Sequence, residues 1–159
     1  MAISSRVYHL LRIPVTDSIV LILYEHLSLQ DLRIALINSF RVLKTRGIFR
    51  CVLPDLEFSA RKYIEDLDKG DALASLAFMR KTLLGTIERP RGLKGFLSSF
   101  LGNSHHLWMW DSKSLPEELN NAGFTQIRVC KFNDCEDEMF KHVEDIARFK
   151  NELAIECRK

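Results

Sequence analysis

The chain has 159 residues, of which 47% are apolar, so it is long enough for one domain with a buried core but too short for two. Its 23 Lys and Arg residues nearly balance its 21 Asp and Glu residues, which argues against the basic surface of a nucleic-acid-binding protein. The longest apolar run, Ile19 to Tyr24, is far shorter than the ~20 residues of a membrane-spanning helix. The first residues lack the apolar core of a signal peptide, and we therefore predict a cytoplasmic protein.

The four cysteines do not show the paired short spacing that builds zinc sites. Most of them lie in apolar, strand-like surroundings, so we expect buried, reduced thiols. They are Cys51, Cys130, Cys135 and Cys157.

The first predicted elements lie before residue 27. Val7 to Pro14 is compatible with a short strand that runs into a turn, because Pro14 disfavours a helix before it. Ile19 to Tyr24 is continuous and rich in branched residues, which predicts a strand buried on both faces. Glu25 and His26 follow this strand directly. Ligands of open α/β sheets bind at the carboxyl ends of parallel strands, so these two residues are candidates for a pocket.

The next stretch predicts a helix and then a second buried strand. Ser28 can cap a helix that runs from Leu29 to Lys44, and Gly47 suits the left-handed position after its end. The run Ile48 to Leu53, interrupted only by Arg50, predicts a parallel strand. The apolar positions of the helix have helical spacing: Leu29, Leu32, Leu36, Phe40 and Leu43.

Two helical patterns and a basic loop come next. Asp55 can cap a helix over residues 56 to 67, and a second helical pattern ends near Gly85. The segment Arg89 to Gly95 has two interpretations: a solvated connector, or a mobile lid over an acidic or phosphorylated substrate.

The last third predicts one more helix-strand unit, a helix and a final strand. Ser114 has capping-box spacing to Glu117 and opens a helix that Gly123 stops. Further elements are expected as follows: a strand at Gln126 to Phe132, a helix at Met139 to Phe149 and a strand at Leu153 to Cys157.

Several short motifs occur in a fixed order: Glu25-His-Leu-Ser28, Arg41-Val-Leu-Lys44, Gly47, Val52-Leu-Pro-Asp-Leu-Glu57, Trp108-Met-Trp-Asp111 and Ala122-Gly-Phe124. Together they resemble the later half of the class I S-adenosylmethionine-dependent methyltransferases, of the methyltransferase type 11-like kind. The resemblance implies an α/β fold with a partial Rossmann-like methyltransferase sheet. It would contain the family's strands four to seven, the last pair antiparallel, with flanking helices in a single domain over residues 1–159.

The resemblance also implies S-adenosylmethionine as cofactor, with Tyr24, Glu25 and His26 as cofactor-binding residues. Such enzymes need a glycine-rich turn after the first strand and an acid after the second. Neither precedes Val7, so we predict a chain truncated before the glycine-rich motif, with impaired cofactor binding. The alternatives are a non-catalytic interaction or regulatory subunit, and a gene fragment derived from a methyltransferase.

Both tryptophans of the chain stand beside two adjacent histidines, which suggests an acceptor pocket with aromatic walls. Its candidate residues are His105, His106, Trp108 and Trp110. Core packing by the tryptophans is the competing interpretation. No acid or cysteine stands at ligand spacing from the His-His pair, so we predict no metal site.

One more expectation concerns the strand Ile19 to Tyr24. In the family's strand order the first strand lies beside the fourth, and here that neighbour would be missing. An uncovered strand edge recruits other strands, so we predict a homo-oligomer or a methyltransferase-like partner at this strand, unless Val7 to Leu11 folds back to cover it.

Overall fold

The computed structural model describes residues 16–21, 24–85 and 106–159. In this part of the chain four strands form one mixed sheet, in the order β1-β2-β4-β3. Strand β1 runs parallel to β2, whereas β4 is antiparallel to both β2 and β3. This arrangement confirms the predicted α/β fold, including the antiparallel last pair. The strands are β1 (Thr16–Leu21), β2 (Leu43–Pro54), β3 (Thr125–Val129) and β4 (Glu152–Arg158).

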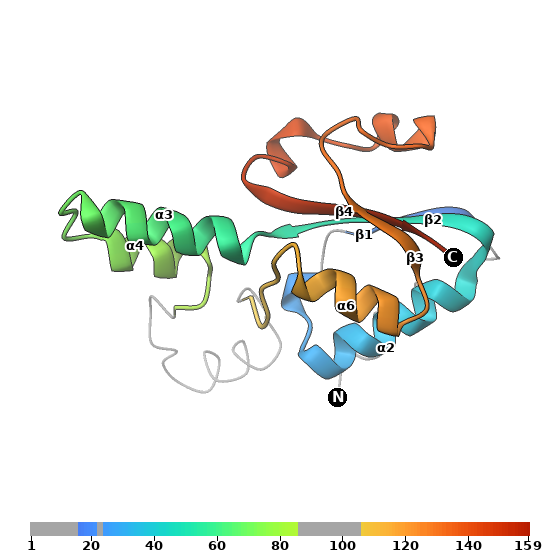
Figure 1. Cartoon of the computed structure of the whole chain (residues 1–159), viewed down its shortest axis with the longest axis horizontal. Helices are drawn as coiled ribbons and strands as arrows, with labels where there is room; N and C mark the ends of the chain where they lie inside the picture. Colours follow the sequence, from blue (N-terminus) through green and yellow to red (C-terminus); the bar gives the residue numbers. More distant parts are fainter. Residues whose placement is uncertain (1–15, 22–23, 86–105) are drawn as a thin grey trace, which may run out of the picture.

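Helices α2 (Leu29–Val42) and α6 (Ser114–Asn121) lie together on one side of the sheet (Figure 1). Helices α3 (Leu56–Asp68) and α4 (Ala74–Lys81) leave the end of β2 as a hairpin that projects beyond the sheet (Figure 1). The described ranges also contain three short 3₁₀ helices: η1 (Tyr24–His26), η2 (Glu138–His142) and η3 (Ile146–Arg148). None of the helices in the described ranges has the length and apolar character needed to cross a membrane.

The main core fills the space between the sheet and α2 with α6. Phe124 packs at its centre, with ring centroids 4.9 Å from Phe49 and 5.2 Å from Phe40. Because neighbouring side chains alternate across a strand, only every second residue of β2 joins this core. The fully or nearly fully buried members include Leu32, Leu36, Phe49, Cys51, Leu53, Leu115, Leu119, Phe124 and Ile155.

The other face of β2 carries a buried charge. Arg50 has no exposed surface, and it is the direct cross-strand partner of Glu156 on β4, which in turn faces Arg128 on β3. The Arg50 Nη1 to Glu156 Oε2 distance is 3.2 Å, and Arg128 Nη2 lies 2.6 Å from Glu156 Oε1. A row of alternating charges therefore crosses three strands.

Arg50 also holds the segment between β3 and β4 against the sheet. Its guanidinium pairs with Glu144 and donates hydrogen bonds to the carbonyl oxygens of Lys131 (2.8 Å) and Asp134 (2.9 Å). The rings of Phe140 and Phe149 lie against it, with centroids 5.9 and 5.6 Å away. A buried guanidinium is tolerated only when its donors and charge are satisfied, as they are here.

The prediction of one helix at Met139 to Phe149 is wrong. The chain instead forms the two short 3₁₀ helices η2 and η3, separated by residues 143–145. Asp137 and Asp145 start them by accepting hydrogen bonds from the amides of Met139 and Ala147. The Glu144 carboxylate is directed to Arg50 and to the Asn133 amide, so tertiary contacts override the local helical pattern.

The predicted ends of the first helix and strand need correction. β1 begins at Thr16, earlier than predicted, and residues 22 and 23 lie outside the described ranges. Helix α2 ends at Val42, because Leu43 already pairs in register with Thr16 of β1. Strand β3 likewise stops at Val129 rather than Phe132.

Gly47 is not the left-handed residue after the helix. The positive φ belongs to Arg46 (67°), and Gly47 is needed for a different reason. A Cβ on Gly47 would lie 2.9 Å from the Lys44 carbonyl oxygen and 3.0 Å from that of Asp17, where β1 passes close by. The glycine therefore permits close approach of two strands.

The helix caps are confirmed in two of three cases. The side chains of Ser28 and Asp55 accept hydrogen bonds from the amides of Asp31 (3.2 Å) and Phe58 (3.0 Å). Ser114, however, does not cap α6. The Asp111 carboxylate does so by accepting from the Ser114 amide at 2.7 Å, and this lowers the pKa of Asp111.

Three expectations concern other parts of the chain. Gly123 stops α6 with a left-handed φ of 104°, as predicted. All four cysteines are free, and all but Cys135 are buried; desolvation raises the pKa of Cys51 to about 12. Val7 to Pro14 and Arg89 to Gly95 lie outside the described residues.

Replacing Arg50 by Met should lower the free energy of unfolding by roughly 3–5 kcal/mol, because Glu144 and Glu156 would remain buried without their cation. Arg33→Met is the matched control: its pair with Glu118 lies at the surface, and its loss should cost at most about 1 kcal/mol. Urea melts of both variants measure the difference. Equal, small losses would show that the Arg50 network does not stabilise the fold.

Candidate functional site

The candidate site lies at the carboxyl ends of the parallel strands β1 and β2. Helix η1 follows β1, and Asp55 at the end of β2 forms a parallel bridge with Trp110. The Leu56 amide donates to the Trp110 carbonyl oxygen at 2.8 Å, which fixes residues 106–110 beside the end of β2. This is the edge of an open α/β sheet at which ligands generally bind.

A backbone contact brings His106 to Glu25 and His26. The Leu107 amide donates to the Glu25 carbonyl oxygen at 2.8 Å. The rings of His26 and His106 then meet edge to face, with centroids 5.2 Å apart. The Nε2 atom of His26 lies 3.6 Å from Oε1 of Glu25. One ligand atom from each of these three residues lies within 4.8 Å of the others, and we call the group the Glu-His-His cluster.

The cluster contains buried polar atoms without partners. Oε2 of Glu25 and Nδ1 of His106 are both buried and lack a hydrogen-bond partner in the described structure. Burial raises the pKa of Glu25 and outweighs the opposing effects of its own backbone amide and of His26. Burial also lowers the pKa of His106, helped by the charge of His26 and opposed by a hydrogen bond to the Thr82 backbone. The neutral imidazole of His106 is therefore favoured at neutral pH.

The two predicted tryptophans have different environments. Trp110 is buried in the main core, as the core-packing interpretation predicted, while Trp108 is 43% exposed. Their ring centroids are 6.1 Å apart. Trp108 is thus the member of the pair that presents an accessible aromatic surface beside His106.

The structure brings together some of the predicted site residues and leaves others unplaced. Glu25, His26 and His106, predicted for two separate sites, form one cluster. Tyr24 is the first residue of η1, but its side chain is not described, and His105 lies outside the described residues. Sequence reasoning missed Thr82, which follows α4 and reaches His106 through its backbone. A backbone contact leaves no signal in the side-chain pattern.

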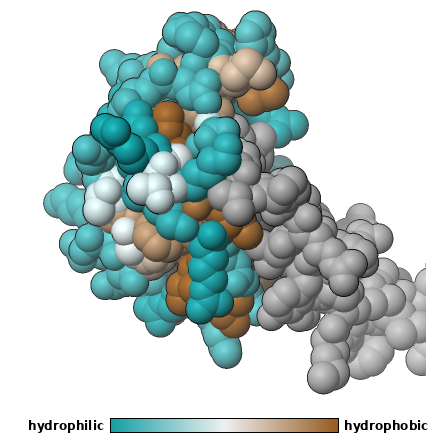
Figure 2. All heavy atoms as spheres, turned by 90° about the vertical axis from the view of Figure 1, so that its right-hand side faces the viewer, coloured by the Kyte–Doolittle hydropathy of each residue, from teal (hydrophilic) through white to brown (hydrophobic). Residues whose placement is uncertain are grey.

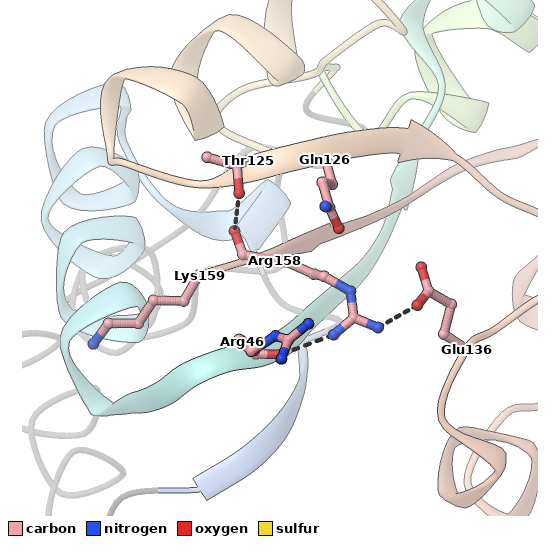
Figure 3. Close-up of a pocket in the computed structure, with 6 residues that line it drawn as sticks. All are labelled: Arg46, Thr125, Gln126, Glu136, Arg158 and Lys159. Carbon is pink, nitrogen blue, oxygen red and sulfur yellow. Dashed lines mark hydrogen bonds and ion pairs between the residues drawn. The ribbon is translucent and has the colours of Figure 1, made fainter.

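A second concavity lies at the opposite end of the sheet, where β2 begins (Figure 3). It has a volume of about 390 Å³. The Arg158 guanidinium is held between the Glu136 carboxylate and the Arg46 carbonyl oxygen, and the Lys159 ammonium donates to the Leu43 carbonyl oxygen at 2.8 Å. Most of this end of the molecule is hydrophilic (Figure 2). Because these two cations are satisfied by the chain itself, the pocket is the weaker candidate. Its lining residues are Arg46, Thr125, Gln126, Glu136, Arg158 and Lys159.

Solved structures of two methyltransferases are among those similar to this chain. One is a putative O-methyltransferase from Nostoc punctiforme, 11% identical, with a TM-score of 0.48 over 92% of this chain and 32% of that one. The other is an S-adenosylmethionine-dependent methyltransferase from Archaeoglobus fulgidus, 15% identical, with a TM-score of 0.49 over 96% of this chain and 64% of that one. The chain thus spans less than two thirds of either neighbour. No family model and no curated protein matches it.

Glu25→Gln should stabilise the protein at neutral pH when a chelator keeps metal ions away from this carboxylate. Burial raises the folded-state pKa of Glu25, so the native state holds this proton more tightly than the unfolded state. As the pH rises from the unfolded pKa through the folded one, the wild type loses stability that the amide retains. Denaturant melts between pH 4 and 8 should show the two proteins converging at low pH. A variant less stable than wild type at pH 7 would contradict the assignment of a destabilising buried carboxylate.

Proposed function

We propose that the chain is a methyltransferase-like protein that corresponds to the later half of that fold and holds the methyl acceptor. We also propose that the chain alone binds S-adenosylmethionine weakly. The observation that carries this proposal is the meeting of η1 with residues 106–110 at the carboxyl ends of β1 and β2. Trp108 offers an aromatic surface for an acceptor there, and Glu25 and His26 offer polar contacts for the cofactor. In such a reaction the protein mainly supplies proximity and orientation for attack on the methyl group.

Weak cofactor binding follows from the arrangement of the glycines. Backbone amides that approach the cofactor closely need a glycine-rich turn between a strand and a helix. Within the described residues, no glycine stands between a strand and a helix that follows it. Gly47 instead allows β1 and β2 to approach each other closely, and Gly123 ends α6.

Titration calorimetry with S-adenosylmethionine, in the presence of a chelator, tests the proposal. We expect heat only at ligand concentrations far above those used for active methyltransferases, and a further loss in Glu25→Gln. Glu117→Gln, which changes an exposed carboxylate on α6, is the control and should behave as wild type. A dissociation constant in the low micromolar range would refute weak binding. Equal affinities of Glu25→Gln and wild type would refute a role for Glu25.

A second candidate function, as a non-catalytic partner of another chain, is favoured by the edge position of β1. Among the described strands, β1 pairs with β2 alone. Its backbone groups on the other side are the kind that accept an added strand. The added strand could come from a second copy of the chain or from a methyltransferase-like partner.

Light scattering over a wide concentration range tests the second candidate, with amide hydrogen exchange at residues 16–21 as the matched readout. Self-association should raise the mean mass and protect those amides together. A monomer whose β1 amides are all protected would show that the edge is covered within the chain. That result would eliminate strand addition.

A further inference from the structure

We propose that Glu25, His26 and His106 form a binding site for a divalent transition metal of the zinc type. The three side chains come from two segments far apart in the sequence, and tertiary structure alone brings them together. Two imidazoles and one carboxylate are a donor set that zinc uses in proteins. The proposal concerns metal binding and holds whether or not the chain binds S-adenosylmethionine.

The spacing of the donor atoms suits one ion. Zinc bonds to nitrogen and oxygen are about 2.0–2.1 Å long, so neighbouring ligands of a tetrahedral ion lie about 3.4 Å apart. The Glu25 Oε1 to His26 Nε2 distance of 3.6 Å is already close to this value. The three donor atoms lie within 4.8 Å of one another, which leaves only a short distance to close around one ion.

The hydrogen bonding of His106 is that of a metal ligand. Its ring bonds to the backbone of Thr82, while Nδ1 is buried without a partner in the described structure. We therefore assign the proton and the Thr82 bond to Nε2, which leaves a lone pair on Nδ1. Metal-binding histidines commonly donate their other ring N–H to a carbonyl oxygen, and this fixes both tautomer and ring orientation.

The carboxylate of Glu25 also lacks the partners that a buried acid needs. Its side chain is only 12% exposed, and in the described part of the chain its ion-pair partner is His26. Oε2 accepts no hydrogen bond from the part of the chain that the structure describes. By contrast, the fully buried Arg50 has every part of its guanidinium engaged. A cation between Glu25 and the two imidazoles would supply the interaction partner that the buried carboxylate lacks.

The site is accessible and would leave a coordination position open. His26 is 27% exposed, so an ion can enter from solvent. Three protein ligands are typical of zinc sites that keep a fourth position for water or a substrate oxygen. The nearby Trp108 lies at the surface, where it could contact a molecule bound at that position.

Calorimetry with ZnCl₂ on the chelator-stripped full-length chain is the primary test. We expect one ion per chain and an affinity that falls at least about tenfold in Glu25→Gln, His26→Gln and His106→Gln, since even residues that merely support a ligand have effects of this size. His142→Gln and Glu117→Gln replace exposed residues outside the cluster and should bind as wild type. The near-ultraviolet spectrum of the Co²⁺ form should lack a thiolate charge-transfer band.

Stability measurements separate a lost ligand from a damaged fold. In chelator, Glu25→Gln should be at least as stable as wild type, whereas added Zn²⁺ should raise the melting temperature of wild type more than that of Glu25→Gln. Cys135→Ser, which removes the one cysteine that is not fully buried, should retain zinc binding. The proposal fails if wild type does not bind zinc, if Glu25→Gln binds as wild type does, or if Cys135→Ser abolishes binding. Failure to bind S-adenosylmethionine would leave these outcomes unchanged.

Discussion

The ion pairs and hydrogen bonds of the fully buried Arg50 hold together the sheet and the segment that follows β3. Arg50 sits in the central strand β2, faces Glu156 across the sheet and binds carbonyl oxygens of the segment that follows β3. A charge removed from water must be matched by partners, and the chain supplies them by wrapping residues 130–149 over the sheet. The Glu144 carboxylate between the two 3₁₀ helices is one of these partners, and its pairing with Arg50 ties that part of the segment to the sheet.

The two ends of the sheet differ in how well their polar groups are satisfied. At the start of β2, Arg158 and Lys159 are tied to carbonyl and carboxylate groups of the chain. At the carboxyl ends of β1 and β2, Glu25 and His106 keep buried atoms that find no partner among the described residues. Buried polar groups are nearly always paired, so this contrast directs attention to the second end. It coincides with the edge where open α/β sheets hold their ligands.

The methyltransferase-like proposal and the metal site rest on different observations. The first depends on the order and polarity of the strands and on the position of Trp108 beside the cluster. The second depends on three donor atoms and on the Thr82 contact that orients His106. An acceptor held beside a bound metal would connect the two proposals, because the metal would supply Lewis-acid chemistry there. The edge strand β1 adds a route by which another chain could complete the fold.

The sequence by itself determined the helix-strand alternation, the caps at Ser28 and Asp55 and the stop at Gly123, because these depend on local spacing and backbone preference. It also placed Glu25 and His26 at the end of a parallel strand. Only the tertiary structure decided that Asp111 caps α6, that Gly47 serves close approach, and that His106 joins Glu25 through the Leu107 amide. These contacts depend on distances between segments remote in the chain, and residue spacing along a sequence carries no such distance.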